Sequence, residues 1–348
     1  MRALIDFAPG GAQLLDARGT VDHLVARGLI SAETLVSAGV TVTDRSSRCR
    51  TYVVRTGPSG FVVKQGTNSE TVQSVRDEAA TYSRLGSVVP VPCLRSFRDG
   101  CLVTDWVPGS TLAGSIERDP RAHAARAPEL AGILARLHGS GPDPSTLPPA
   151  RPSAVFLLAR PPLAAFQFHS HGSHLLTRLI QADEMLTAGL LSLSSRWRAS
   201  SQIHNDVRPE NIIETPGGGL VVIDWELAGR GDPRWDLGAL VAGHVIAFLE
   251  DADVWARPAA DRHRADRLGA LHAVVRRVLD AYQEGGGCVV PPVDLVQWVA
   301  GRMVLTTMER CSAAPSVSAA CRHLLQVAAN LFRRPEAGAQ IFLGVRQP

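Results

Sequence analysis

Lysine is almost absent from this sequence. Of its 36 basic residues only Lys64 is a lysine, and all the others are arginines. Alanine and arginine are both abundant, which indicates a coding bias that replaces lysine with arginine wherever either residue serves. A lysine that persists against this bias is expected where a compact ammonium on a flexible stem does what a guanidinium cannot. Lys64 is therefore the first candidate functional residue.

Other features are also missing, and each absence excludes a class of protein. The six cysteines are scattered, with no zinc-knuckle or CxxC spacing, so we expect reduced thiols in a cytoplasmic protein. The longest apolar stretch, residues 237–249, is too short to span a bilayer, and no signal-peptide pattern opens the chain, so no membrane association is expected. A net charge of only +3 does not indicate a nucleic-acid partner.

What is present predicts a folded chain of about two domains. The 348 residues are 45% hydrophobic, which is enough to bury a core. Residues 1–38 predict a helical preface. Thr20 is expected to cap a helix that stops at Gly28, and Ser31 to cap a second helix that ends before Gly39.

Residues 39–105 then change to a hydrophobic period of two, which is typical of strands. A helix is expected over residues 69–85, with Glu78 on its inward face because this residue lies between Val75 and Tyr82 at helical spacing. The pattern predicts a five-stranded antiparallel sheet with this helix inserted after the third strand, and hence an α+β fold. The expected strands are 40–43, 51–54, 61–64, 93–97 and 101–105.

Residues 106–109 interrupt the strand pattern and resemble a hinge, and the chain beyond them is mainly helical. The segment 203–213 within this region holds the strongest motif, IHNDVRPENII. Asp206 and Asn211 leave one loop five residues apart, and Asp224 is expected to return beside them across a small hairpin. Three converging oxygen donors suit Mg²⁺, which shares its remaining coordination with phosphates and water.

HNDVRPEN followed by DWE resembles the catalytic loop and metal strand of the aminoglycoside phosphotransferase and choline kinase-like superfamily, which shares its fold with protein kinases. Lys64, Glu78 and residues 105–107 match the family's strand-three lysine, inward glutamate and hinge in order. The resemblance covers about residues 40 to 250 and implies a bilobal protein-kinase-like fold. Its parts would be a helical preface (1–38), a nucleotide-binding N-lobe (39–105), a hinge (106–109) and a helical C-lobe with the catalytic loop and acceptor site (110–348).

The resemblance also implies a role for each matched residue in phosphoryl transfer that depends on Mg²⁺ and on ATP or GTP. Asp206 would orient the acceptor hydroxyl and take its proton, and Arg208 replaces the lysine that protein kinases place near the acceptor and the γ-phosphate. Asn211 and Asp224 would hold Mg²⁺. The nucleotide would be bound by Lys64, which Glu78 positions, by the backbone of Asp105 and Val107, and by a phosphate-covering loop with Ser46, Ser47 and Arg48.

The sequence departs from the kinase pattern in two places. It has neither a GxGxxG nor a Walker loop, so the serine-containing loop would have to cover the phosphates instead. The DFG triplet of protein kinases is replaced by Asp224-Trp225-Glu226, so no phenylalanine switch is expected. His204 would brace the catalytic loop, and Asp236 would support it from below.

The acceptor remains open between two classes. One is a small molecule, as in antibiotic-resistance kinases of the aminoglycoside type. A polycationic antibiotic needs an acidic pocket, yet the chain from Trp225 onward has 13 acidic residues against 14 arginines, so it carries no excess of acid.

A third possibility, a nucleotide-binding pseudokinase scaffold, is disfavoured because every expected polar residue is present.

The other class is a peptide. DVRPEN is similar to the DLKPEN loop of Ser/Thr protein kinases. The preface, residues 47–50, residues 64–66 and the DWELAG–GDPRWD segment resemble the phosphotransferase-like kinases of class V lanthipeptide and thioamitide gene clusters. In those pathways phosphorylation of Ser or Thr prepares the side chain for elimination by a lyase. The resemblance thus favours a precursor peptide as the hydroxyl-bearing acceptor, with a lyase as a separate partner.

Overall fold

The computed structural model describes residues 14–140, 147–150, 153–162, 170–251 and 260–345, which form two compact units. The first unit contains the chain up to Arg118 together with Pro209–Ala228, and the second contains Asp119–Arg208 and the chain from Gly229 onward. The segments 110–118 and 209–228 therefore group with the N-terminal sheet, whereas the sequence placed them in the helical lobe.

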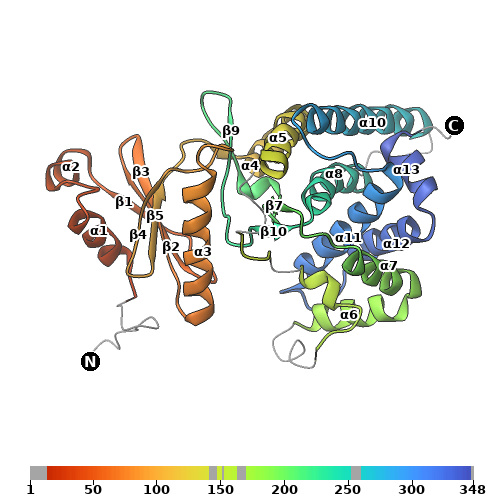
Figure 1. The fold of residues 1–348 in the computed structure, drawn as a ribbon, viewed down its shortest axis with the longest axis horizontal. Coiled ribbons are helices and arrows are strands. Elements are labelled where there is room, and N and C mark those ends of the chain that lie inside the picture. The colour runs from red at the N-terminus through yellow and green to blue at the C-terminus, as the bar shows by residue number, and fades with distance from the viewer. Residues whose placement is uncertain (1–13, 141–146, 151–152, 163–169, 252–259, 346–348) are drawn as a thin grey trace. The chain divides into compact units, whose positions relative to one another are not determined.

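The first unit is built on the predicted five-stranded antiparallel sheet, in the order β1-β2-β3-β5-β4 (Figure 1). Helix α3 (Ser69–Leu85) follows the third strand over the expected residues, because Asn68 caps it through a reciprocal capping box with Thr71. Asp99 and Gly100 both adopt positive φ, as the tight hairpin predicted between the last two strands requires. The strands are β1 (Thr41–Asp44), β2 (Arg50–Thr56), β3 (Ser59–Gln65), β4 (Leu94–Arg98) and β5 (Cys101–Asp105).

The preface forms helices α1 (Ala17–Ala26) and α2 (Ala32–Ala38). Ser31 caps α2 as predicted, since its Oγ accepts the Thr34 N–H at 3.0 Å. The prediction for Thr20 was wrong: Asp16 caps α1, its carboxylate accepting the Gly19 N–H at 2.7 Å, while the Thr20 hydroxyl donates to the Asp16 carbonyl. The carboxylate is the better acceptor, so the helix starts one turn earlier.

The two preface helices cover one face of the sheet. Leu24 and Ile30 are buried against Val54, Val63 and Val103. These valines lie on β2, β3 and β5 and point to the same face of the sheet, because successive side chains of a strand alternate between the two faces. In Figure 1, α1 and α2 lie on one side of the sheet and α3 on the other. The described part of the preface therefore completes the core on one face of the sheet, and α3 contacts the sheet from the other side.

A small second sheet explains why the later segments belong to this unit. Strand β6 (Ser110–Thr111) pairs with β8 (Ile212–Glu214), and β8 pairs with β9 (Leu220–Val222), all antiparallel. Gly109, just before β6, has φ +143, and a Cβ there would lie 2.2 Å from the Glu214 carbonyl oxygen. Only glycine permits this close approach. Helix α4 (Leu112–Arg118) and the short η4 (Pro209–Asn211) complete the unit.

The second unit is mainly helical around α8 (Pro233–Glu250), which is buried along most of its length and contacts α5, α10 and α11. The rings of Trp197, Trp235, Trp298 and Phe156 pack at centroid distances of 5.3–6.3 Å beside its N-terminus. The other elements are α5 (Arg121–Ser140), η2 (Ala154–Leu157), α6 (His171–Ala182), α7 (Glu184–Ser195), β7 (Ser201–Ile203), β10 (Gly229–Gly231), α10 (Ala260–Glu284), α11 (Pro292–Cys311), α12 (Ala319–Arg333) and α13 (Pro335–Leu343).

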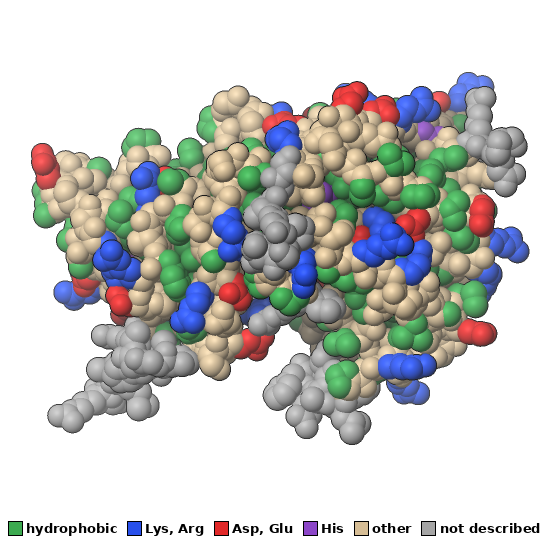
Figure 2. Space-filling model, in the orientation of Figure 1, with side chains coloured by type: hydrophobic (Ala, Val, Ile, Leu, Met, Phe, Trp, Pro, Cys, Tyr) green, Lys and Arg blue, Asp and Glu red, His purple; other side chains and the backbone are tan. Residues whose placement is uncertain are grey.

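Among the described residues, no helix combines the length and hydropathy needed to cross a bilayer. On the face drawn in Figure 2, basic and acidic side chains are interspersed.

Candidate active site

The β8–β9 hairpin positions the two expected magnesium ligands. Ile212 pairs with Val222, and the Asn211 carbonyl accepts the Ile223 N–H at 2.9 Å. The pairing of the two strands therefore continues to the residue before Asp224. Asn211 is only 4% exposed. Asp224 has φ +62, a conformation that costs energy for a residue with a side chain and is often found at functional sites.

Lys64 lies at the centre of three carboxylates. Its Nζ is 2.8 Å from Glu78 Oε2, 2.9 Å from Asp224 Oδ1 and 3.1 Å from Glu226 Oε2. The lysine comes from β3, Glu78 from the inward face of α3, and the two other acids from the segment after β9. The structure thus brings together three residues that the sequence assigned to the site, Lys64, Glu78 and Asp224, and adds a fourth, Glu226.

The charges of this cluster control its protonation. Burial alone would lower the pKa of Lys64, but the three carboxylates outweigh it and hold that pKa above its ordinary value. Burial raises the pKa of Glu78 to about 7, with the Lys64 ammonium opposing the rise. Three acids around one ammonium leave an excess of negative charge, which a further cation would balance.

A cavity of about 700 Å³ within the first unit contains this cluster. Its volume is that of a typical small-molecule site. Its lining combines apolar with charged side chains, as expected of a site for a heterocycle that carries phosphates. The apolar ones include Val53, Val62, Ile213 and Ile223, and the polar or charged ones include Arg45, Arg55, Lys64, Glu78, Asn211, Asp224 and Glu226.

Residues at the predicted hinge line the same cavity. These are Asp105, Trp106 and Val107. The Trp106 N–H donates to the Gly60 carbonyl, whereas the Asp105 N–H points the other way, to the Cys93 carbonyl. Since N–H and C=O of one residue point to the same edge of a strand, the Asp105 carbonyl faces away from β3. Its carboxylate is held by Arg95 at 2.6 and 2.8 Å.

The β1–β2 loop folds back on itself through its serines. Asp44 accepts the Ser46 N–H at 2.8 Å, and the Ser46 hydroxyl accepts the Thr51 N–H at 3.1 Å. The Ser47 N–H donates to the Cys49 carbonyl at 3.1 Å, and Ser47 lines the cavity. The Ser46 side chain therefore stabilises the loop itself, while Ser47 lies against the space where phosphates were expected.

The second unit carries the catalytic loop, whose backbone is anchored by a buried aspartate. The Asp236 carboxylate accepts the N–H groups of His204 at 2.7 Å and Asn205 at 2.9 Å, and lies 3.2 Å from His138 Nε2. Burial would raise the pKa of Asp236, but the hydrogen bond from His138 and the nearby imidazoles and backbone donor hold it below its usual range. This geometry agrees with the supporting role predicted for Asp236.

Asp206 and Arg208 follow in the same loop. The Asp206 N–H donates to His204 Nδ1 at 3.2 Å, so that imidazole nitrogen acts as an acceptor. Asp206 Oδ2 lies 3.3 Å from Arg208 Nε, and the Arg208 side chain is 43% exposed. Asn205 has φ +71, so the turn that presents the aspartate is backbone-strained.

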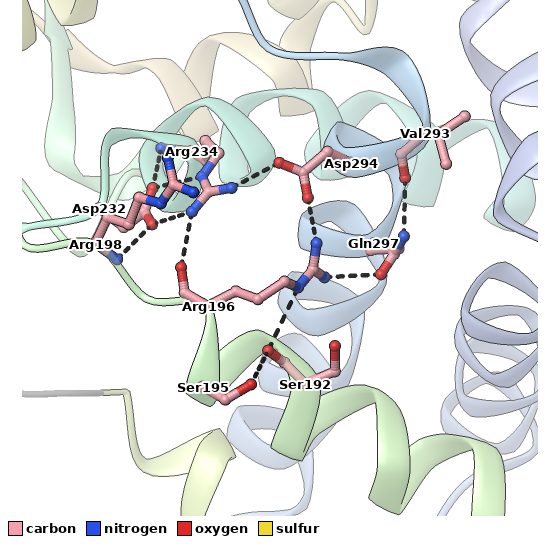
Figure 3. Close-up of polar contacts among 9 residues, drawn as sticks. All are labelled: Ser192, Ser195, Arg196, Arg198, Asp232, Arg234, Val293, Asp294 and Gln297. Atoms are coloured by element: carbon pink, nitrogen blue, oxygen red, sulfur yellow. Dashed lines mark hydrogen bonds and ion pairs between the residues drawn. The ribbon is translucent and has the colours of Figure 1, made fainter.

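Contacts of the GDPRWD segment hold the first turn of α8 in place (Figure 3). Asp232 caps the helix and receives the Arg198 N–H at 2.8 Å, and Pro233 occupies the first helical position. Arg234 bonds Asp232 and reaches Asp294 of α11 at 2.6 Å, and Arg196 binds the same carboxylate. This network fixes the helix start on which Asp236 depends.

Sequence reasoning missed three residues beside the expected ones. Glu226 binds Lys64, and its place two residues after Asp224 could have signalled this. The Tyr82 hydroxyl accepts the Asp224 N–H at 3.3 Å, one helical turn after Glu78. Arg302 of α11 is only 6% exposed, stacks on Trp235, and has a Nη2 3.5 Å from the Val207 carbonyl. Nothing distinguishes Arg302 in an arginine-rich sequence.

Comparison with known proteins agrees with this geometry. The profile of the phosphotransferase enzyme family matches residues 44–282. No curated protein sequence is significantly similar to the chain. Among solved structures, the chain is similar to choline kinase LicA from Streptococcus pneumoniae, with 17% identity, a TM-score of 0.55, and coverage of 90% of this chain and 98% of that one.

Two aminoglycoside phosphotransferases are also similar. The ADP-bound APH(2'')-Ib has a TM-score of 0.54 and 18% identity, with 91% of this chain and 99% of that one covered. APH(3'')-Id from Streptomyces rimosus has a TM-score of 0.51 and 19% identity, with 84% and 99% covered. These identities establish a shared fold rather than a shared substrate, and the predicted kinase-like α+β fold is confirmed. The chain is a phosphotransferase and belongs to the phosphotransferase enzyme family.

Proposed function

We propose that this phosphotransferase moves the γ-phosphoryl group of ATP, bound with Mg²⁺, to a Ser or Thr hydroxyl of a precursor peptide. The observation that carries the nucleotide part is the convergence of Lys64, Glu78 and Asp224 in a cavity that apolar side chains also line. An adenine would pack against the apolar side chains, and its phosphates would extend toward Lys64.

The donor set fits magnesium. Oxygen atoms of Glu78, Asp224 and Glu226 lie within 4.8 Å of one another, and the buried Asn211 adds an amide oxygen to the lining of the same cavity. Mg²⁺ prefers hard oxygen ligands and is usually held by one or two carboxylates together with phosphate oxygens. Asn211 and Asp224 would hold the ion, which when bound neutralises charge on the phosphates.

Each remaining residue has a defined task in the transfer. Lys64 binds the α- and β-phosphates and stays protonated because of its carboxylate partners. Asp206 receives the proton of the acceptor hydroxyl as the acceptor oxygen bonds to the γ-phosphorus and the bond to the β-phosphate oxygen breaks. Arg208 lies beside that carboxylate and is half exposed, so it can bind the transferred group. Positioning and charge supply most of the rate.

The second unit supports a peptide acceptor better than a polycation. Asp232, Asp236 and Asp294 near the start of α8 are each occupied by arginine, histidine or backbone donors at 2.5–3.2 Å. Asp206 is paired with Arg208. These carboxylates already have partners and offer a polycationic antibiotic little counter-charge, whereas a neutral hydroxyl needs only Asp206. A lyase that eliminates the phosphate would be a separate protein.

Intact-mass analysis tests the proposal. The purified protein, ATP and Mg²⁺ are incubated with a Ser/Thr-bearing precursor peptide encoded beside it, and separately with a pooled panel of aminoglycosides, macrolides and choline. We expect a mass gain of one phosphate on the peptide, and none with the Asp206→Ala variant, which should still bind nucleotide. Phosphate on an antibiotic or choline instead would refute the peptide acceptor. Nucleotide binding that is lost in Lys64→Ala, with no phosphate on any acceptor, would refute the proposed transfer and favour a nucleotide-binding scaffold.

A further inference from the structure

Helix α11 carries a charged side chain in the middle of its most buried stretch. Residues 298–305 are all buried, and Arg302 is the only charged residue among them. Taking a guanidinium out of water is costly, and the protein interior offsets this cost only through well-placed partners. The contacts of Arg302 should therefore show why a charge is kept at this position.

The guanidinium of Arg302 lies over a fixed aromatic ring. Its Cζ is 4.7 Å from the ring centroid of Trp235, which is within the range of a cation–π contact. Trp235 is fully buried, and its neighbour Arg234 is held by Asp232 and Asp294 (Figure 3). The position of Arg302 is therefore tied to the first turn of α8.

From this ring Arg302 reaches the catalytic loop. Its Nη2 is 3.5 Å from the carbonyl oxygen of Val207, which lies between Asp206 and Arg208 in the sequence. Within the described part of the chain, Nη1 is buried and has no hydrogen-bond partner. One long hydrogen bond cannot replace the water around a guanidinium, so hydrogen bonding alone does not account for the buried charge.

The carboxylates around Arg302 supply the other favourable interactions. Burial holds the pKa of Arg302 below its ordinary value, and of the charges that oppose this effect Asp206 acts most strongly, ahead of Glu309 and Asp236. Asp206 also pairs with Arg208 at 3.3 Å, but the Arg208 side chain is 43% exposed. Solvent screens an exposed pair far more than a buried charge. Arg302 is thus the buried cation that acts on Asp206.

We propose that Arg302 is a positioning residue, which holds the catalytic loop at the Val207 carbonyl so that Asp206 is presented to the acceptor hydroxyl. The inference rests on the proposed function, in which Asp206 receives the proton of that hydroxyl. Because Arg302 acts through the loop, its loss should slow the transfer step. ATP binding in the cavity of the first unit should not change.

Two substitutions separate this role from a purely structural one. Arg302→Met places an apolar side chain on Trp235, and replacing a buried charge in this way is often neutral or stabilising, so its midpoint of urea unfolding should equal or exceed that of wild type. Arg302→Lys keeps the charge but buries a more strongly hydrated ammonium, so its midpoint should be lower. The order of activity should differ, with wild type highest, Arg302→Lys intermediate and Arg302→Met lowest.

Transfer of phosphate from γ-labelled ATP measures that activity, with the precursor peptide, the pooled small-molecule panel or water alone as the acceptor. For Arg302→Met we expect kcat to fall about 10- to 100-fold and KM for ATP to change less than about twofold. The matched control is Arg310→Met on the same helix. It removes a guanidinium that is 39% exposed and paired with Glu250, and it should leave kcat unchanged.

The possible results separate the two proposals. A kcat of Arg302→Met within about twofold of wild type would overturn the positioning role and leave the kinase assignment standing. Losses of stability and of activity that follow the same order in the two Arg302 variants would do the same. Absence of phosphate transfer by the wild type to peptide, panel and water would overturn the proposed function instead.

Discussion

Replacing Asp236 with asparagine should both destabilise the second unit and slow catalysis. The side chain is 1% exposed, and its carboxylate accepts two backbone N–H groups and faces His138. An asparagine offers one carbonyl oxygen and turns its NH₂ group toward a buried donor. Loss of one charge-assisted hydrogen bond costs about 1.5–3 kcal/mol, and a buried donor left unsatisfied costs about 1–3 kcal/mol more. We therefore expect a loss of about 3–5 kcal/mol in unfolding free energy.

Urea unfolding at pH 7, followed by tryptophan fluorescence, measures this loss, because Trp235 and Trp298 are fully buried in the second unit. The control is Asp280→Asn on the exposed side of α10, which should change the unfolding free energy by less than about 0.5 kcal/mol. Turnover by Asp236→Asn should fall about 100-fold, since the loop that carries Asp206 loses its anchor. An unfolding free energy within 1 kcal/mol of wild type would refute the anchoring argument.

The pH dependence gives an independent check on the same carboxylate. Its pKa in the folded protein lies below the usual value, so the unfolded chain binds its proton first as the pH falls. The stability that Asp236 contributes is therefore fully present above about pH 4, the ordinary pKa of aspartate, and is lost as the pH falls further. Asp236→Asn should remove this part of the acid destabilisation.

Two other substitutions test the lone lysine and a buried histidine pair. Lys64→Arg should change the unfolding free energy by less than about 1 kcal/mol, because the three carboxylates retain a cation. The larger head group should misplace the phosphates, so kcat/KM should fall about 100-fold in a steady-state ATP assay. Wild-type activity would contradict the special role of an ammonium. His244 stacks on His123 at 3.8 Å, and burial holds the pKa of His244 well below its ordinary value. Unfolding free energy should therefore decrease by up to about 1.4 kcal/mol per pH unit below pH 6.5 through this residue, and urea titrations of His244→Phe should lack that part of the slope; an unchanged slope would show that His244 is protonated in the folded protein.

The elements with strong local signals were predictable from the sequence. Helix α3 has an apolar face of helical period with a good cap before it, and the Asp99-Gly100 pair specifies its turn without tertiary help. The inward position predicted for Glu78 followed from the same periodicity. The N-terminus of α1 did not follow, because Asp16 and Thr20 are both good caps and only the structure shows which one accepts.

Contacts between residues far apart in the sequence could not be predicted. Strand β6 has only two residues, too few to show a period, and it pairs with β8 about one hundred residues later. The sequence therefore gave no reason to group residues 209–228 with the first sheet. For the same reason the bridge from Lys64 to Glu226 was not expected, since it depends on how the segment after β9 approaches β3.

Because the chain has a single lysine, chemical labelling of amines can report on the state of this one side chain. An amine-directed acylating reagent has one side-chain target in the whole chain, apart from the amino terminus. Only the uncharged amine reacts, and the carboxylates around Lys64 keep that form scarce. The rate of labelling therefore measures how often the ammonium leaves its partners, and a single mass increment records each event without any engineered tag.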